Sequence, residues 1–198
     1  MGYTHYYNRP RELNEAKFKL AVDDCKKLCD ALPIPLGGAD GTGEPVFTDD
    51  LLVFNGSVDS QSFCKSDVRI PWPDDDAEGF SIVGDDEPKV GRWYAGDILK
   101  SRCVNENGDG SFETFQIERI IDLKDHEDEG SEAKYLEFCK TAFRPYDLNV
   151  QCCLIIFKHF FGDEFLVSTD SKDKLWNEAR DICQHILGYG LDFELDKK

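Results

Sequence analysis

The segment from Leu148 to Phe161 constrains the fold more than any other part of the chain, because it is apolar on nearly every side of a helix. Pro145 can occupy the first helical turn, and Gly162 can close the last one. A helix that is apolar all round is buried on several faces. The sequence therefore predicts a buried helix that other elements of the chain must cover.

Two further helices and several strands are predicted around this segment. Apolar residues three and four positions apart predict an amphipathic helix from Phe18 to Leu32 and another from Leu175 to Leu187. Helices and strands are mixed without a regular alternation, which favours an α+β fold with a single layer of mostly antiparallel sheet covered by about three helices. The predicted strands, rich in β-branched and aromatic residues, are 3–7, 51–54, 112–121, 135–141 and 164–168.

The chain has the length of one domain and is strongly acidic. Its 198 residues include 40 Asp or Glu and 23 Lys or Arg, which gives a formal charge of −17. A chain of this length buries about two-thirds of its unfolded surface in one core, which predicts a single domain over 1–198. Two predicted insertions, at about 57–104 and 122–134, hold most of the acidity: 71–88 carries −7 and 122–132 carries −5.

This charge limits the partners that the sequence predicts. A negative surface repels phosphate backbones and anionic headgroups, so nucleic acid is disfavoured and no membrane partner is expected. No apolar run reaches the roughly 18 residues of a membrane span, and the N-terminal sequence has no apolar signal core, which predicts a cytoplasmic protein. The eight cysteines are then expected to be reduced and to pack as small apolar residues.

Three segments that look like motifs are better explained by structure than by chemistry. The glycine-rich segment 37–43 is not followed by the Lys and Ser/Thr of a P-loop. Four residues separate Cys139 from Arg144, one fewer than the loop of a cysteine phosphatase requires. The turn at 105–110 begins like a calcium loop, but Gln116 stands where a bidentate Glu is needed. The sequence predicts no metal site and identifies no cofactor.

An ordered set of short motifs resembles a known protein family. The motifs are MGYTHY (1–6), FNG (54–56), ETF (113–115), FCKT (138–141), PYD (145–147), KHFFGDEF (158–165) and GYG (188–190). Together they resemble a family of small proteins of microbes, their viruses and fungi that has no established activity. The chain departs from the family pattern by extra residues between FNG and ETF and at 122–134. The resemblance implies a single-domain intracellular protein and supplies no substrate, cofactor or catalytic residue.

These motifs bring polar side chains to predicted strand ends. If the first four predicted strands are neighbours, the side chains line one cleft, where contact between His, Lys and Asp would suit acid–base chemistry. Lys140 would hold an anionic group of a small molecule, and His5 or Asp147 would move a proton during hydrolysis or transfer. The candidate catalytic residues are His5, Lys140, Asp147 and His159, and the candidate ligand-binding residues are Tyr6, Asn55, Glu113, Thr141 and Tyr146.

The sequence leaves two alternatives to this pocket. The protein could instead be a non-enzymatic interaction protein that presents the acidic residues 71–88 and 122–132 to a basic partner. The polar residues could also form a structural network, with Asp147 as an N-terminal helix acid, Asn55 making a turn and His159 favoured by a helix dipole. Whether the protein is an enzyme therefore stays open at this stage.

Overall fold

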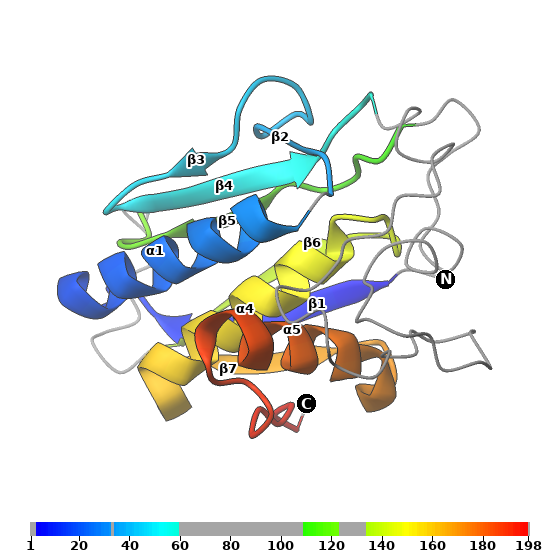
Figure 1. Cartoon of the computed structure of the whole chain (residues 1–198). Helices are drawn as coiled ribbons and strands as arrows, with labels where there is room; N and C mark the ends of the chain where they lie inside the picture. The colour runs from blue at the N-terminus through cyan, green and yellow to red at the C-terminus, as the bar shows by residue number, and fades with distance from the viewer. Residues whose placement is uncertain (1–2, 33, 60–108, 123–133, 198) are drawn as a thin grey trace.

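The computed structural model describes residues 3–32, 34–59, 109–122 and 134–197, and the statements below concern these residues (Figure 1). Both predicted insertions and the turn at 105–110 lie almost wholly outside them. The elements, labelled as in Figure 1, are β1 (Thr4–Pro10), α1 (Glu15–Ala31), β2 (Leu36–Gly37), β3 (Val46–Phe47), β4 (Leu51–Gly56), β5 (Phe115–Glu118), β6 (Lys134–Lys140), α4 (Asp147–Phe161), β7 (Leu166–Thr169) and α5 (Asn177–Leu187), with short 3-10 helices at Gly162–Glu164 and Asp173–Trp176.

The strands form two antiparallel sheets. In the first, β1 lies between β6 and β7, and in the second, β4 pairs with β2, β3 and β5. A single bridge between Glu12 and Ile120, beside a 2.9 Å hydrogen bond from Leu13 N to Arg119 O, connects the two. The predicted α+β class, with antiparallel pairing and three α-helices, is confirmed. The strands are divided over two sheets where the sequence suggested one layer.

The predicted buried helix is α4, and the other helices pack against it. In Figure 1 the three helices lie on one side of the sheets, and α1 and α5 both contact α4. Every residue from Asp147 to Phe157 is buried, which agrees with the apolar composition of this segment. Each apolar side chain fully buried here stabilises the fold by about 1.5–3 kcal/mol. Packing in the core therefore holds α4 in place. α4 in turn positions the residues at its two ends.

Five thiols meet where the three helices pack. They come from α1, α4 and α5, and all are buried: Cys25, Cys29, Cys152, Cys153 and Cys183. Burial raises the pKa of the Cys25, Cys152 and Cys153 thiols, and a hydrogen bond with Cys153, followed by burial, raises the pKa of Cys29. Because the thiolate is the reactive form, these cysteines act as packing residues.

The C-terminal segment contacts the edge of β7 that is not paired with β1. The backbone N of Asp196 donates to Val167 O at 2.7 Å, and one carboxylate oxygen of Asp196 accepts from Val167 N at 2.8 Å. The Lys158 ammonium binds both oxygens of the same carboxylate at 3.0 and 3.1 Å. Asp196 thus satisfies the backbone of an edge strand that would otherwise be open to another strand.

We expect the five thiols at the helix junction to resist alkylation in the folded protein. Iodoacetamide at neutral pH should leave them unmodified until guanidinium unfolds the chain, because all five are buried and the pKa of Cys25, Cys29, Cys152 and Cys153 is raised, which suppresses their thiolates. Mass spectrometry of the digested protein gives the extent of reaction at each position. Cys64 and Cys103 lie outside the described residues and are scored separately. Rapid modification of any of the five in the folded state would contradict this packing.

Replacing Asp196 should destabilise the β7 edge. Asp196→Ala removes an acceptor of a backbone hydrogen bond and the partner of Lys158, so we expect the free energy of unfolding to fall by about 1–2 kcal/mol. Urea denaturation measures the change. Asp192→Ala, at an exposed residue of the same segment, is the matched control and should change it by less than about 0.5 kcal/mol. Equal effects of the two variants would argue against the edge contact.

Candidate functional site

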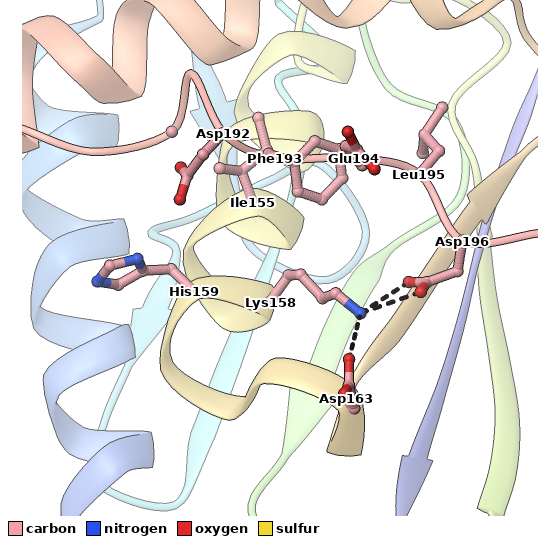
Figure 2. A pocket seen from close by; sticks show the side chains of 10 residues that line it. Ile155, Lys158, His159, Asp163, Asp192, Phe193, Glu194, Leu195 and Asp196 are labelled. Carbon is pink, nitrogen blue, oxygen red and sulfur yellow. Dashed lines mark hydrogen bonds and ion pairs between the residues drawn. The ribbon is translucent and has the colours of Figure 1, made fainter.

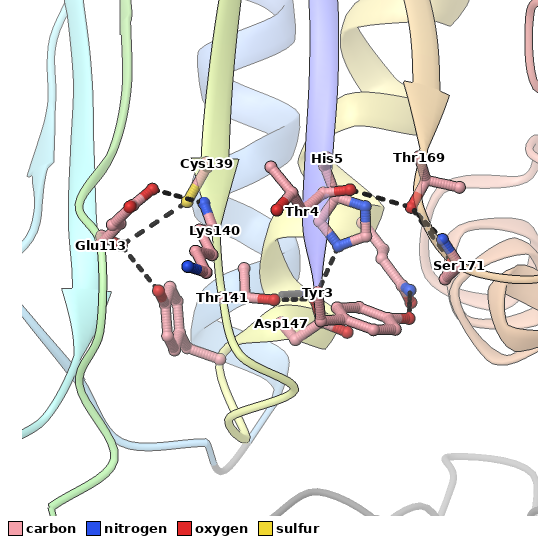
Figure 3. Close-up of polar contacts among 12 residues, drawn as sticks. Tyr3, Thr4, His5, Glu113, Cys139, Lys140, Thr141, Asp147, Thr169 and Ser171 are labelled. Atoms are coloured by element: carbon pink, nitrogen blue, oxygen red, sulfur yellow. Dashed lines mark hydrogen bonds and ion pairs between the residues drawn. The ribbon is translucent and has the colours of Figure 1, made fainter. Parts of the chain in front are cut away.

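A buried polar network joins the start of β1 to the start of α4. His5 Nε2 lies 2.6 Å from Asp147 Oδ1, and the Thr141 hydroxyl donates to the same oxygen (Figure 3). All three side chains are fully buried. β1 supplies His5, the connection after β6 supplies Thr141, and Asp147 is the first residue of α4. Three segments far apart in sequence are therefore tied to one carboxylate.

The second ring nitrogen of His5 has no hydrogen-bond partner among the described residues. The His5 ring meets Tyr3 and Trp176 edge-on, with ring centroids 5.2 and 5.0 Å away. Asp147 Oδ1 accepts a hydrogen bond from His5 Nε2, and the buried Nδ1 has no partner within the described part of the chain. A histidine oriented by a carboxylate, with its other ring nitrogen unpartnered, is an arrangement suited to proton transfer.

A second set of contacts lies beside the first, between β5 and β6. The backbone N of Lys140 donates to the Glu113 carboxylate at 2.7 Å, and the Tyr146 hydroxyl donates to the Glu113 carbonyl at 2.6 Å. Burial raises the pKa of Tyr146, so its hydroxyl stays a donor. The Lys140 ammonium lies 5.7 Å from the centre of the Phe112 ring. Glu113, Lys140 and Tyr146 are therefore neighbours of the His5 network, through Thr141 and Asp147.

Asn55 connects this site to β4. Its side-chain amide donates to the carbonyls of Ala39 and Phe112 at 3.3 and 3.1 Å, and its side-chain oxygen accepts from the backbone N of Phe112 at 3.0 Å and of Gly56 at 2.8 Å. Four hydrogen bonds hold this side chain among backbone groups. Asn55 thus positions the segment that carries Glu113. Its side chain has a structural role here, because its hydrogen bonds go to backbone groups.

The turn between β6 and α4 has an unusual backbone. Ala142 and Phe143 have φ values of 49° and 58°, and Arg144 N donates to Thr141 O at 3.0 Å. Two successive residues with positive φ across such a bond form a type I′ turn, which normally requires Gly or Asn. A left-handed conformation costs a non-glycine residue of order 1–3 kcal/mol and is concentrated at functional sites. This turn is therefore part of the candidate site.

Lys140 and Tyr6 lie on the opposite face of the first sheet from His5. Neighbouring residues of a strand point to opposite faces, and the register pairs Thr4 with Lys140 and Tyr6 with Phe138. The Tyr6 hydroxyl donates to the Asp170 carboxylate at 3.3 Å. The expected convergence of all the side chains on one cleft is therefore not seen, since the sheet separates Lys140 and Tyr6 from His5.

His159 is far from the other candidates. It lies twelve residues after Asp147 on α4, which is about 18 Å along the helix at 1.5 Å per residue. Its exposed ring stacks on Tyr189 at 3.7 Å. Figure 2 shows it beside a separate cavity of about 390 Å³, where Asp196 and Asp163 neutralise the Lys158 ammonium. The structure therefore does not bring His159 together with His5, Lys140 and Asp147.

Sequence reasoning did not identify three parts of this site. The ring contacts of Tyr3 and Trp176 with His5 are long-range contacts that leave no local pattern. The turn at Ala142 and Phe143 carries none of the residues that normally mark it. The contact of the Lys140 ammonium with the Phe112 ring is also long-range and was not predicted.

Comparisons with known proteins add no constraint on function. No protein-family model, curated protein or solved structure matches the chain, so the family resemblance of its motifs stays a prediction. Among the described helices, none is long and apolar enough to cross a membrane. Within the same residues, no group of three or more His, Cys, Asp and Glu could hold a metal ion. Function is therefore inferred from the geometry of the site.

Removing the central carboxylate should strongly destabilise the protein. Asp147→Ala leaves the buried His5 and Thr141 without their acceptor, and we expect the free energy of unfolding to fall by about 3–5 kcal/mol, as when one partner of a buried pair is removed. Thr141→Val should cost about 1–2 kcal/mol. Denaturant titration measures both.

Asp49→Ala is the control for Asp147→Ala. Asp49 pairs with Lys19 at the surface, where both side chains are more than half exposed, so its loss should cost less than about 1 kcal/mol. An Asp147→Ala variant as stable as Asp49→Ala would show that the buried network does not hold β1 to α4.

Proposed function

We propose that the protein binds a small molecule with an anionic group where β6 leads into α4, and that Lys140 holds the anion. The proposal rests on the absence of a counter-ion for the Lys140 ammonium. In a chain of formal charge −17, the half-buried Lys140 forms no ion pair among the described residues. The nearby Glu113 carboxylate binds the backbone N of Lys140.

Other lysines of the same chain support this argument by contrast. Lys19, Lys26 and Lys158 each contact a carboxylate at 2.7 to 3.0 Å. The Lys140 ammonium lies over an aromatic ring without a carboxylate partner among the described residues, which leaves it available to an external anion. Lys17 shares this arrangement over Phe161, so Lys140 is distinguished by its position beside Glu113 and the turn that leads into α4. This contact supports the proposal that Lys140 has the anion-holding role predicted from its sequence context.

The His5–Asp147 pair would give this site acid–base chemistry. His5 Nδ1 can accept a proton, and Asp147 would stabilise the imidazolium that forms. That chemistry serves hydrolysis or transfer on a small molecule. A molecule held by Lys140 reaches His5 only around the strand ends, past the turn at 141–144, because His5 is fully buried on the other face of the sheet. Binding is therefore the primary proposal, and catalysis is the extension that requires this turn to open.

Binding of a basic partner is the second candidate. The charge of 71–88 and 122–132 favours it, and these segments lie outside the described residues except Asp122. A cytoplasmic location would suit either function and stays a prediction. Deletion of 71–88 with unchanged capture of a basic partner would argue against that segment as the contact.

Thermal shift tests the anion site directly. Inorganic phosphate, carboxylates and sugar phosphates are added to the protein, and a ligand at tenfold excess over its Kd should raise the melting temperature by about 3–6 °C, because it binds only the folded state. Lys140→Gln should abolish the shift without changing the unliganded melting temperature.

Lys17→Gln is the matched control for Lys140→Gln. Lys17 also places its ammonium 5.7 Å from an aromatic ring, that of Phe161, at a different part of the surface, so this variant should retain the full shift. A shift that survives Lys140→Gln, or a wild-type protein that no anion stabilises, would refute the proposal.

A further inference from the structure

The outer face of the first sheet exposes apolar side chains beside Lys140. Leu136 and Phe138 on β6 are 61% and 58% exposed, although large apolar residues normally pack inside. Phe138 pairs with Tyr6 across the strands, and their ring centroids are 6.4 Å apart. The helices lie on the other side of this sheet (Figure 1). Clustered exposed apolar residues of this kind mark binding surfaces.

The Lys140 ammonium, which forms no ion pair within the described part of the chain, belongs to the same face. Lys140 follows Phe138 by two residues on β6, so their Cα atoms are about 7 Å apart and their side chains share a face. The ring below the ammonium, that of Phe112, is itself 44% exposed. In Figure 3, Lys140 lies near Thr4, its cross-strand partner, at the end of the strands. Exposed aromatic rings and the Lys140 ammonium therefore lie next to one another.

A ligand that satisfies both features carries an anion and a flat aromatic ring a few ångströms apart. Aliphatic acids and sugar phosphates supply only the anion. A nucleotide supplies both, because its phosphate can bind an ammonium while its base stacks on a side-chain ring, a contact that every base can make. Resting on the proposed anion site, we infer that the ligand of Lys140 is a nucleotide whose base lies on Phe138 and Tyr6.

The charges on this face orient the nucleotide. Asp170 binds the Tyr6 hydroxyl and would repel a phosphate there, whereas Lys140 attracts one at the strand end. Asn8, opposite Leu136 in the register, adds an amide that can bond a base edge. One lysine in a chain of charge −17 cannot hold a long phosphate backbone. The ligand is therefore a free nucleotide or one nucleotide of a short single strand.

The test titrates the full chain with adenosine monophosphate, adenosine and inorganic phosphate by calorimetry at low ionic strength. Adenosine monophosphate should bind about tenfold or more tighter than either part alone. Phe138→Ala should reduce its affinity to that of phosphate, and Lys140→Gln to that of adenosine. Leu20→Ala, at an exposed apolar residue of α1, and Lys17→Gln are matched controls that should bind like the wild type.

The outcomes separate this inference from the anion site on which it rests. Phosphate binding that requires Lys140, together with no gain from the base or no effect of Phe138→Ala, would overturn the nucleotide and leave the anion site standing. Binding of neither phosphate nor nucleotide would overturn both. An eight-nucleotide single strand that binds more than tenfold tighter than the monophosphate would identify a strand as the source, and equal affinity would identify the free nucleotide.

Discussion

The contact of Asp147 with His5 and Thr141 is the interaction on which the arrangement of this protein depends. α4 is held by apolar burial, which is strong but has no preferred direction. A buried carboxylate at its first residue is costly unless hydrogen bonds satisfy it, and only one placement of β1 and of the β6 end supplies them. The helix N-terminus adds a favourable dipole for the negative charge. Apolar packing thus stabilises the helix, and this network determines how the first sheet sits against it.

The two ends of α4 differ in how completely their polar groups are satisfied. At the C-terminal end, Lys158 is neutralised by Asp196, which also completes the hydrogen bonds of the β7 edge. The N-terminal end instead holds a nitrogen of His5 that has no partner among the described residues, and two left-handed residues in the turn before the helix. Unfavourable local features of this kind persist only where the surrounding core is strong enough to hold them. That asymmetry, independent of any motif, supports the proposal that the functional site lies at the N-terminal end.

Much of the fold is predictable from the periodicity of the sequence. The same periodicity also implies part of the site's layout, although that was not recognised. The stripe of α1 and the apolar α4 bury the residues that their spacing indicated, and α5 buries Ala179, Ile182 and Cys183 of its stripe. β5 covers only Phe115–Glu118 of the predicted 112–121, because Phe112 bonds the Asn55 side chain and Ile120 pairs with Glu12. The alternation of a strand already places His5 and Tyr6 on opposite faces, and the rise of a helix separates His159 from Asp147. The turn at 141–144 could not be predicted, since its conformation is imposed by contacts with Tyr3 and not by its own residues.

The net charge takes on a different meaning once Lys140 is located. Repulsion by a charge of −17 acts over the whole surface and grows with the number of phosphates a ligand carries. The attraction of one ammonium acts over a few ångströms and is strengthened by the ring beside it. Added salt screens the distant repulsion over a Debye length of about 10 Å at 0.1 M but affects the close contact less. If Lys140 binds an anion as proposed, the acidity that disfavours a long nucleic acid would favour a ligand with one or few phosphates, and the specificity of this face would come from its stacking surface.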